Sequence, residues 1–510
     1  MKDLFSHLKN DLPASIVVFF VAVPLCLGIA MASEAPLFSG IIAGIIGGIV
    51  VGAFSGSQLG VSGPAAGLAV IVIDAVVKLG TWEAFLLAVV LAGVLQVIMG
   101  FLKLGIIGYY FPTTVIKGML AGIGLVIILK QIPHALGNYL QFDKDLTYGD
   151  TGQKTTFAEF GEMFSNISTS AVVTTISCMA ILMLWDVVLS KKHKIFGIIQ
   201  GPLVAVLVGI LLNLGFQFYD AKELMFTPSQ LVSIPVAASV NDFIGQFSWP
   251  DFRLETLTNT NIYITAFVIA IVASLESLLS VEATDKLDPQ KRKTPRNQEL
   301  KAQGIGNILS GMVGGLPVTQ VIVRSSANIT FGAKTKLSAI IHGFLILICV
   351  ILIPNVLNLI PLSALAAILF MVGYKLAKPA LFKKMYSYGW NQFIPFIATI
   401  IGILATDLLK GIGIGMVIGI YYILKNSLKN AARKEKTEGG HRIILAEEVT
   451  FLNKGSILKQ LEETPEHSTL IIDGTASKFI DFDVLELIKD FQINSKEKNI
   501  KLELVNIKLS

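Results

Sequence analysis

The sequence predicts an all-α polytopic membrane protein of about fourteen transmembrane segments, followed by a small cytoplasmic α/β domain. Three observations predict it. The 510 residues are 53% hydrophobic and 15% charged, and the charges gather in a few segments, which is typical of a membrane protein with a soluble tail. Two glycine-rich segments that contain a proline share one pattern. After Lys436, short apolar runs alternate with helical patterns such as ILKQLEE, which indicates an α/β domain.

The transmembrane segments follow from apolar runs near the roughly 20 residues that a spanning helix needs. Such runs lie at 13–31, 38–55, 84–101, 111–130, 169–190, 195–215, 260–284, 337–359, 361–378, 392–409 and 411–429. Shorter or glycine-broken segments lie at 64–78, 303–314 and 318–331. We therefore expect a cytoplasmic N-terminus at 1–12, a first repeat at 13–215, an extracytoplasmic loop at 216–258, a second repeat at 259–430, a linker at 431–440 and the α/β domain at 441–510.

The placement of lysine and arginine predicts the topology, because positive clusters stay in the cytoplasm. Basic groups such as 288–301 and 425–436 are separated by even numbers of predicted crossings. The stretches at 137–168 and 216–258 are poorer in basic residues and follow odd numbers of crossings. Both termini are therefore predicted to be cytoplasmic. The net charge of +5 lies beside apolar segments and indicates topology, not nucleic-acid binding.

The two broken segments predict an inverted repeat with half-helices at segments 3 and 10. They read GVSGPAAGLAVIV (60–72) and GGLPVTQVIVRSSA (314–327), and Pro317 follows Pro64 by 253 positions. The same offset from Pro24, the expected break in the first span, leads to a position beside Glu276. Repeats of seven spans must have opposite orientations, because seven is odd. Discontinuous helices in matching places of inverted repeats indicate a transporter site near the middle of the membrane.

The ends of the half-helices are candidates for anion binding. A helix that begins inside the protein has N–H groups without partners and a partial positive charge at its N-terminus. One lip of the site is formed by Ser62, Gly63, Pro64, Ala65 and Ala66, and the other by Pro317, Val318, Thr319 and Gln320. The alternative is that these glycines and prolines serve only helix packing, since both are frequent in membrane helices.

Glu276 is the candidate coupling residue. It lies in the apolar run NIYITAFVIAIVASLESLLSVEA, with Ser280 one helical turn later on the same face. A carboxylate at this depth costs about 2.5–3.5 kcal/mol on insertion scales, so it is normally paired or placed in a cavity. We expect Glu276 to be a protonation or cation site whose charge state is coupled to transport. A structural glutamate that bonds a neighbouring helix is the alternative.

Arg324 is expected two turns into the second half-helix, where a buried arginine needs a partner. Glu276 or a bound anion would serve. The alternative is that its side chain snorkels to the cytoplasmic interface.

Cofactor and enzyme chemistry have no support in the sequence. Cys26, Cys178 and Cys349 fall in apolar runs without CxxC or Cys/His spacing, which favours packing roles over disulfides, zinc or haem. The sequence contains no HExxH, no GxSxG and no paired intramembrane aspartates. We expect no cofactor other than sodium as a coupling ion, and no enzyme activity.

The membrane part resembles the SulP (sulfate permease) family of anion transporters over about residues 10–430. The elements that carry the resemblance, in the family's order, are AVPLCLGIA, VSGPAAG, FPTTVIKGMLAGIGLVI, ASLESLLS, NQELKAQGIGNILSGMVGGLP, VIVRSS and ATDLLKGIGIGMVIGI. The tail, with LIIDGTASKFIDFDVLELI, is similar to a short STAS domain.

The resemblance implies a core domain, formed by spans 1–4 and 8–11, that slides against a gate domain of spans 5–7 and 12–14, usually in a homodimer. It implies that Glu276 binds sodium or a proton, that Ser280 helps to bind sodium, and that the anion lies between spans 3 and 10. Many members have Pro-Gln and a later aromatic residue in the first span, where this chain has Pro24-Leu25 and Ile29. Phe19 or Phe20 is the candidate replacement for those anion contacts.

The sequence thus predicts a secondary active transporter of a small inorganic oxyanion, bicarbonate or sulfate, in the inner membrane. Sodium or protons would drive it through Glu276. An uncoupled exchanger or channel of the same fold would not need Glu276 to change charge. A nucleobase permease shares the architecture, but the STAS-like tail argues against it. The tail itself could recruit a protein partner.

Overall fold

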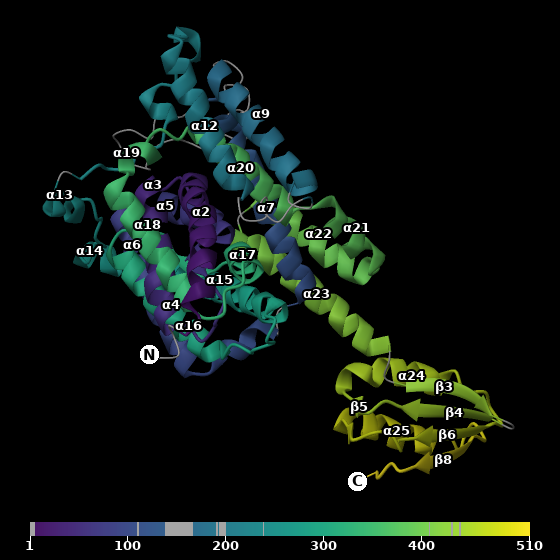
Figure 1. Ribbon diagram of the computed structural model, residues 1–510. Helices are drawn as coiled ribbons and strands as arrows, with labels where there is room; N and C mark the ends of the chain where they lie inside the picture. The colour runs from purple at the N-terminus through teal and green to yellow at the C-terminus, as the bar shows by residue number, and fades with distance from the viewer. Residues whose placement is uncertain are drawn as a thin grey trace. The chain divides into compact units, whose positions relative to one another are not determined.

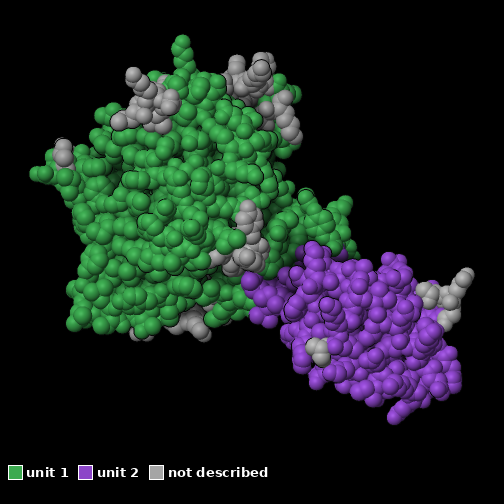
Figure 2. Space-filling model, turned by 90° about the horizontal axis from the view of Figure 1, so that it is seen from below, with its two compact units in different colours: residues 1–388, 396–414 green, residues 389–395, 415–510 purple. Residues whose placement is uncertain are grey.

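The computed structural model describes residues 6–109, 112–137, 167–189, 192, 200–237, 239–406, 408–429, 432–437 and 440–509. The chain divides into two units, coloured separately in Figure 2. Unit 1 comprises 1–388 and 396–414, and unit 2 comprises 389–395 and 415–510. Most of the predicted acidic loop at 137–168 and the first residues of the segment predicted at 195–215 lie outside the described residues.

The described residues contain the fourteen predicted segments, and nine helices, counting joined ones once, are long and apolar enough to cross a membrane. The segments are α2 (Leu8–Ala32), α3 (Leu37–Ile46) continued by η1 (Gly47–Val51) and α4 (Gly52–Phe54), α5 (Ala69–Leu79), α6 (Trp82–Phe101), α7 (Thr113–Leu136), α9 (Thr169–Leu184) continued by η4 (Trp185–Leu189), α12 (Gly201–Phe218), α15 (Thr260–Leu287), α16 (Arg296–Met312), α17 (Ile322–Thr330), α18 (Leu337–Leu352), α20 (Leu362–Leu376), α22 (Trp390–Ala405) and α23 (Leu408–Lys429). The predicted fold class is confirmed, with α5 and α17 as the half-helices.

Shorter elements connect these segments. They are η2 (Ala66–Leu68), η3 (Leu104–Tyr109), η5 (Lys222–Leu224), η6 (Pro228–Gln230), α13 (Val240–Gly245), α14 (Leu254–Thr258), α19 (Pro354–Leu357) and α21 (Pro379–Ser387). Two three-residue strands, β1 (Ser62–Pro64) and β2 (Val318–Gln320), precede the half-helices.

Two predictions about the segments are wrong. The first span is not broken at Pro24, because α2 runs through this residue without interruption. A proline removes one intrahelical hydrogen bond, and the packing of α2 against α3, α17 and α18 holds the helix together around it. The ninth segment begins at Arg296 instead of 303, because the polar residues of its first turns are buried and hydrogen-bonded inside the protein.

The helices of unit 1 form two groups. In the first group, α6 packs on α15 and α16, while α2 packs on α3, α17 and α18 (Figure 1). In the second group, α20 packs on α7 and α9, and α9 packs on α12. Contacts between the groups run mainly from α2 to α20 and α12. The helices placed here are spans 1, 2, 4 and 8–11 in the first group and spans 5–7 and 12 in the second, as the family resemblance implies for its core and gate domains, and we call them the core group and the gate group.

Glycine crossings reveal the repeat within the core group. A Cβ on Gly93 of α6 would lie 2.6 Å from the carbonyl oxygen of Gly304 of α16. A Cβ on Gly48 of η1 would lie 2.6 Å from Cα of Gly343 of α18. Segment 4 therefore crosses segment 9 as segment 2 crosses segment 11, which is the pairing that two repeats of seven require.

The segment between α12 and α15 touches both groups. On the gate side, Asn358 binds both backbone groups of Ile234, with its Oδ1 2.7 Å from the nitrogen and its Nδ2 2.9 Å from the oxygen. On the core side, the rings of Phe243 and Phe247 lie 6.2 and 5.9 Å from the ring of Phe38. The segment therefore bridges the two groups.

Unit 2 contains the α/β domain. Its strands are β3 (Ala432–Thr437), β4 (Gly440–Leu445), β6 (Thr469–Asp473) and β8 (Lys501–Val505) in the sheet order β3-β4-β6-β8, with β5 (Glu448–Val449) paired to β7 (Phe479–Ile480). The remaining elements are η7 (Phe451–Asn453), α24 (Lys454–Glu462) and α25 (Phe482–Asn494). Ile443, Ile472 and Ile488 are among the fully buried residues of its core. The predicted linker at 431–440 is wrong, because Ala432–Thr437 pairs with β4 as an edge strand.

Candidate functional site

The two half-helices approach each other through a short antiparallel ladder. Ser62 pairs with Gln320, Gly63 with Thr319 and Pro64 with Val318. The half-helices expected at 64–78 and 318–331 therefore begin later than predicted. Pairing gives their backbone groups partners in an interior without water, where each unpaired group would cost several kcal/mol. Helical structure begins after the strands, at Ala66 in one repeat and Ile322 in the other.

Residues beside the ladder attach it to the second half-helix. The N–H of Val321 donates to the oxygen of Val61 at 2.9 Å. The N–H of Val61 donates to Oγ of Ser325 at 3.0 Å, and that hydroxyl donates to the oxygen of Val321 at 2.8 Å. The start of α17 is therefore fixed against the first repeat.

Glu276 faces the first half-helix. The backbone N–H of Gly67 donates a hydrogen bond to its carboxylate. A Cβ on Gly67 would lie 2.6 Å from each carboxylate oxygen, so the absence of a side chain allows this approach. Oε2 of Glu276 is buried and has no hydrogen-bond partner within the described residues. A carboxylate at this position is favoured by the partial positive charge of a helix N-terminus.

Ser280 is buried one turn after Glu276, and two neighbours that the sequence analysis missed link α15 to β2. Oγ of Ser277 accepts from the N–H of Gln320 at 3.3 Å. Oγ1 of Thr284 accepts from Nε2 of Gln320 at 3.0 Å and donates to the oxygen of Ser280 at 2.6 Å. The hydroxyls recur three and four residues apart, a spacing that places them on one helix face and could have revealed them.

Arg324 lies in the first turn of α17, not two turns into it, and its side chain is fully buried. Snorkelling to the interface is therefore excluded. Nη2 lies 3.3 Å from Sγ of Cys26, and a side chain on Gly63 would overlap Nη1. Within the described residues, no ion pair joins Arg324 to Glu276, and Nε and Nη1 have no hydrogen-bond partner. A buried, unneutralised guanidinium thus lies against the middle of β1.

A polar stripe on α16 supports both strands. Glu299, Gln303 and Asn307 are spaced four residues apart and are fully buried. Nε2 of Gln303 lies 2.8 Å from Oε1 of Glu299 and 2.8 Å from Oγ of Ser62. Asn307 accepts from the N–H of Val318 at 2.6 Å and donates to its oxygen at 3.1 Å. The sequence analysis placed Glu299 in a basic loop and missed the stripe, although its four-residue spacing was visible.

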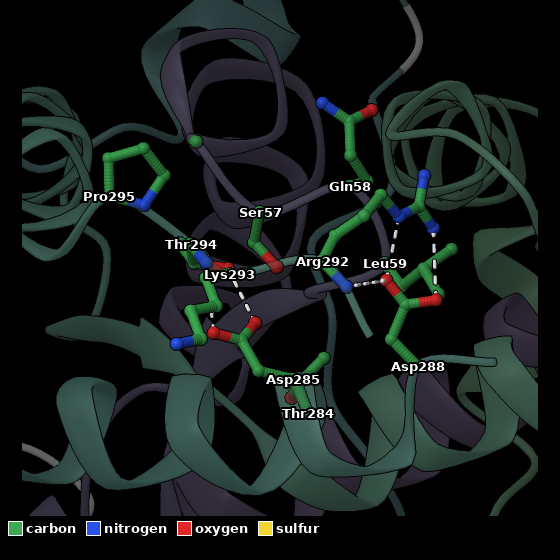
Figure 3. Close-up of a pocket in the computed structure, with 11 residues that line it drawn as sticks. Ser57, Gln58, Leu59, Thr284, Asp285, Asp288, Arg292, Lys293, Thr294 and Pro295 are labelled. Carbon is green, nitrogen blue, oxygen red and sulfur yellow. Dashed lines mark hydrogen bonds and ion pairs between the residues drawn. The ribbon is translucent and has the colours of Figure 1, made fainter. Parts of the chain in front are cut away.

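A cavity of about 280 Å³ adjoins the site at the end of α15 (Figure 3). It is lined by Gly56, Ser57, Gln58, Leu59, Thr284, Asp285, Asp288, Arg292, Lys293, Thr294 and Pro295. Arg292 Nε pairs with Oδ2 of Asp288 at 2.6 Å. Thr284 both lines the cavity and bonds Gln320, so this cavity reaches the side of the site where β2 meets α15.

The structure therefore brings together most of the predicted site residues. The ladder contains Ser62, Gly63, Pro64, Thr319 and Gln320. Ala65 precedes η2 and Ala66 begins it, and Glu276, Ser280 and Arg324 lie beside these elements. Phe19 lies on α2, where its partly exposed ring is 5.3 Å from the ring of Phe20. Its role as an anion contact stays a prediction.

Comparison with known proteins decides the family. The profile described as the sulfate permease family matches residues 8–399. The chain belongs to the sulfate permease family. This membership confirms the resemblance of the membrane part and the expectation of a transporter that is not an enzyme.

Individual relatives are consistent with this family membership. The chain is 25% identical over 516 residues to the Bacillus subtilis (strain 168) protein named "Putative sulfate transporter YvdB", covering 98% of this chain and 91% of that one. It is 26% identical over 463 residues to "Bicarbonate transporter BicA" of Synechocystis sp. (strain ATCC 27184 / PCC 6803 / Kazusa), covering 89% and 76%. Its fold is similar to that of the solved SLC26A9, with a TM-score of 0.78, 16% identity and coverage of 98% and 84%.

Proposed function

We propose that the chain is a secondary active transporter of a small inorganic oxyanion, bicarbonate or sulfate, driven by sodium or protons through Glu276. The observation that carries the proposal is the buried guanidinium of Arg324 at the ladder between two half-helices. The protein lies in the cell (inner) membrane with both termini in the cytoplasm, as the distribution of basic residues indicates.

The anion binds where Arg324 and the ends of the half-helices supply positive charge. A guanidinium presents planar N–H groups that match the oxygens of an oxyanion. The backbone N–H groups at the start of η2 and α17 add partial positive charge. Gly63 and Ala65 carry no bulky side chain, so the guanidinium of Arg324 can lie directly against the ladder. The names of the relatives, which refer to sulfate and bicarbonate, support these two anions.

The coupling ion binds at Glu276. The buried carboxylate of Glu276 accepts a hydrogen bond from the N–H of Gly67. A proton or a sodium ion that neutralises this charge would stabilise it. Ser280 lies one turn away on α15 and supplies a hydroxyl oxygen, which is the kind of ligand that hard cations prefer. Binding of a cation at Glu276 would reduce the negative charge near the anion, so that both solutes are bound together more tightly than either alone.

Transport follows from movement of the core group against the gate group. The residues around Glu276 and Arg324 belong to the core group, since they lie on α2, η2, α15, α16, α17 and the two strands. The anion and the coupling ion would therefore travel together as the core group slides, in an elevator-type cycle. Assembly as a homodimer would keep the gate groups stationary in the bilayer.

The test is uptake of labelled bicarbonate and labelled sulfate into proteoliposomes, with sodium and proton gradients imposed separately. We expect one gradient to drive accumulation of one anion, and Glu276→Gln to abolish that accumulation while anion exchange continues. Glu282→Gln is the matched control, because Glu282 lies on the same helix and is paired with Lys286 at 2.6 Å. Equal transport by wild type and Glu276→Gln under every gradient would instead indicate an uncoupled exchanger or channel.

A further inference from the structure

We infer that Cys26 is a positioning residue for anion binding: its sulfur orients the guanidinium of Arg324 without neutralising it. This inference rests on the proposed function. The two residues are far apart in the sequence, on α2 and α17, yet Nη2 of Arg324 donates to Sγ of Cys26 at 3.3 Å. Both side chains are fully buried.

The position of the sulfur is fixed by close packing of α2 against α3. A Cβ on Gly44 would lie 2.6 Å from Sγ of Cys26. A side chain on Gly40 would overlap the backbone oxygen of Cys26. These two glycines form a notch that receives Cys26, so its side chain is held in place independently of Arg324.

A thiol suits this role because it is a weak, neutral acceptor. A bond to one terminal nitrogen fixes the rotation of the planar guanidinium, since its N–H groups have a rigid geometry. Nε and Nη1, which have no hydrogen-bond partner within the described residues, are left for an anion. Nη1 lies against Gly63 in β1, which places this edge at the ladder. A carboxylate at position 26 would compete with the anion for the same charge.

The first test compares Cys26→Ala, Cys26→Ser and Cys349→Ala in the proteoliposome assay, with labelled bicarbonate and labelled sulfate as probes. Loss of one hydrogen bond to the guanidinium predicts that Cys26→Ala raises KM roughly threefold to tenfold, with little change in the maximal rate. Cys26→Ser, which keeps an acceptor, should restore most of the affinity. Cys349→Ala, which removes a buried thiol from α18, should leave KM unchanged.

The second test does not depend on transport. Thermal unfolding of the purified full chain is measured for Cys26→Ala, Arg324→Gln and the double variant without added anion. Coupling predicts that the double variant loses less stability than the sum of the single losses. Additive losses together with an unchanged KM in Cys26→Ala would overturn the inference and leave the proposed function intact. Coupled losses in a protein that transports neither anion would overturn the proposed function and retain the contact.

Discussion

At the residue scale, the site depends on positions where a side chain is missing. Gly67 allows the carboxylate of Glu276 to reach a backbone N–H, and Gly63 allows Arg324 to lie against β1. Both contacts join residues more than 200 positions apart in the sequence. The importance of Glu276 could be predicted from the apolar residues around it, with either a coupling role or a structural role. The absence of an ion pair with Arg324 could not, because it depends on which face each helix turns toward the other.

The close contact between Gly67 and Glu276 leads to a direct prediction. In Gly67→Ala, the new methyl group would lie 2.6 Å from both oxygens of Glu276, so the carboxylate must move away from the helix end. Overpacking of this kind typically costs about 1–3 kcal/mol, and we expect gradient-driven uptake to fall roughly tenfold or more. The assay is uptake of labelled anion under the driving gradient.

Gly215→Ala on α12 is the matched control, since a Cβ there meets nothing within 4 Å. Full uptake by Gly67→Ala at wild-type protein levels would show that Glu276 does not need its bond to the helix end.

At the element scale, α16 acts as a scaffold for the ladder. Its amide side chains make hydrogen bonds that a neighbouring strand would otherwise make. Asn307 bonds the N–H and oxygen of Val318, and Gln303 donates to Oγ of Ser62. Hydropathy found the long apolar helices because a spanning helix carries a strong signal. It misplaced the start of α16, whose buried face is polar. It also missed the strands, because three residues are too few to show a β pattern and β1 includes Pro64.

We expect Asn307→Leu to destabilise unit 1. The substitution leaves the N–H and oxygen of Val318 and the side-chain oxygen of Gln96 without their bonds to Asn307. Each buried group left unpaired costs about 1–3 kcal/mol. The expected result is a clear fall in the unfolding temperature of the detergent-solubilised chain.

The control for this change is Asn261→Leu, at an exposed position near the start of α15, which should unfold at the wild-type temperature. An unchanged unfolding temperature in Asn307→Leu would mean that the ladder does not depend on α16.

At the scale of the whole molecule, the two units obey different rules. Unit 1 buries its polar groups among apolar helices, whereas unit 2 contains, after the end of α23, an α/β domain with an apolar core of its own. The sequence predicts a change to an α/β domain after Lys436, because composition shifts there, whereas the α/β fold already begins with β3 at Ala432. It assigned the first strand, β3, to a linker, since ARKEKT has no apolar alternation and is an edge strand only because β4 pairs with it.

In unit 2, Asp473 provides a pH-dependent prediction. Hydrogen bonds from the side chain and the backbone of Thr475, and then from Arg442, lower the pKa of Asp473 from 3.8 to about 2. Since the folded pKa lies below the unfolded one, the ionised carboxylate stabilises the fold above about pH 4, and this stability is lost as the pH falls toward 2. Hydrogen exchange of β4 and β6 in the full chain, corrected for intrinsic rates, should speed up over that range.

Asp473→Asn should already show the faster exchange at pH 7 and should lack the additional change between pH 4 and 2. Helices of unit 1 serve as the internal reference, because their exchange should not respond to the substitution. Identical exchange in wild type and Asp473→Asn at pH 7 would contradict the assigned role of the carboxylate.

The segment between α12 and α15 also has a mechanical consequence. At Ile234 it is bonded to Asn358, whose neighbour Leu359 is bonded to Asn213 of α12 in the gate group, and at Phe243 it packs on Phe38 of the core group. A chain of this length can extend to about 30 Å at roughly 3.3–3.6 Å per residue. In the proposed elevator-type cycle, with both contacts intact, the segment would permit short movements of the core group and would resist movements longer than its extended length. The stroke of the transporter would then be limited by a loop that touches neither of the transported ions.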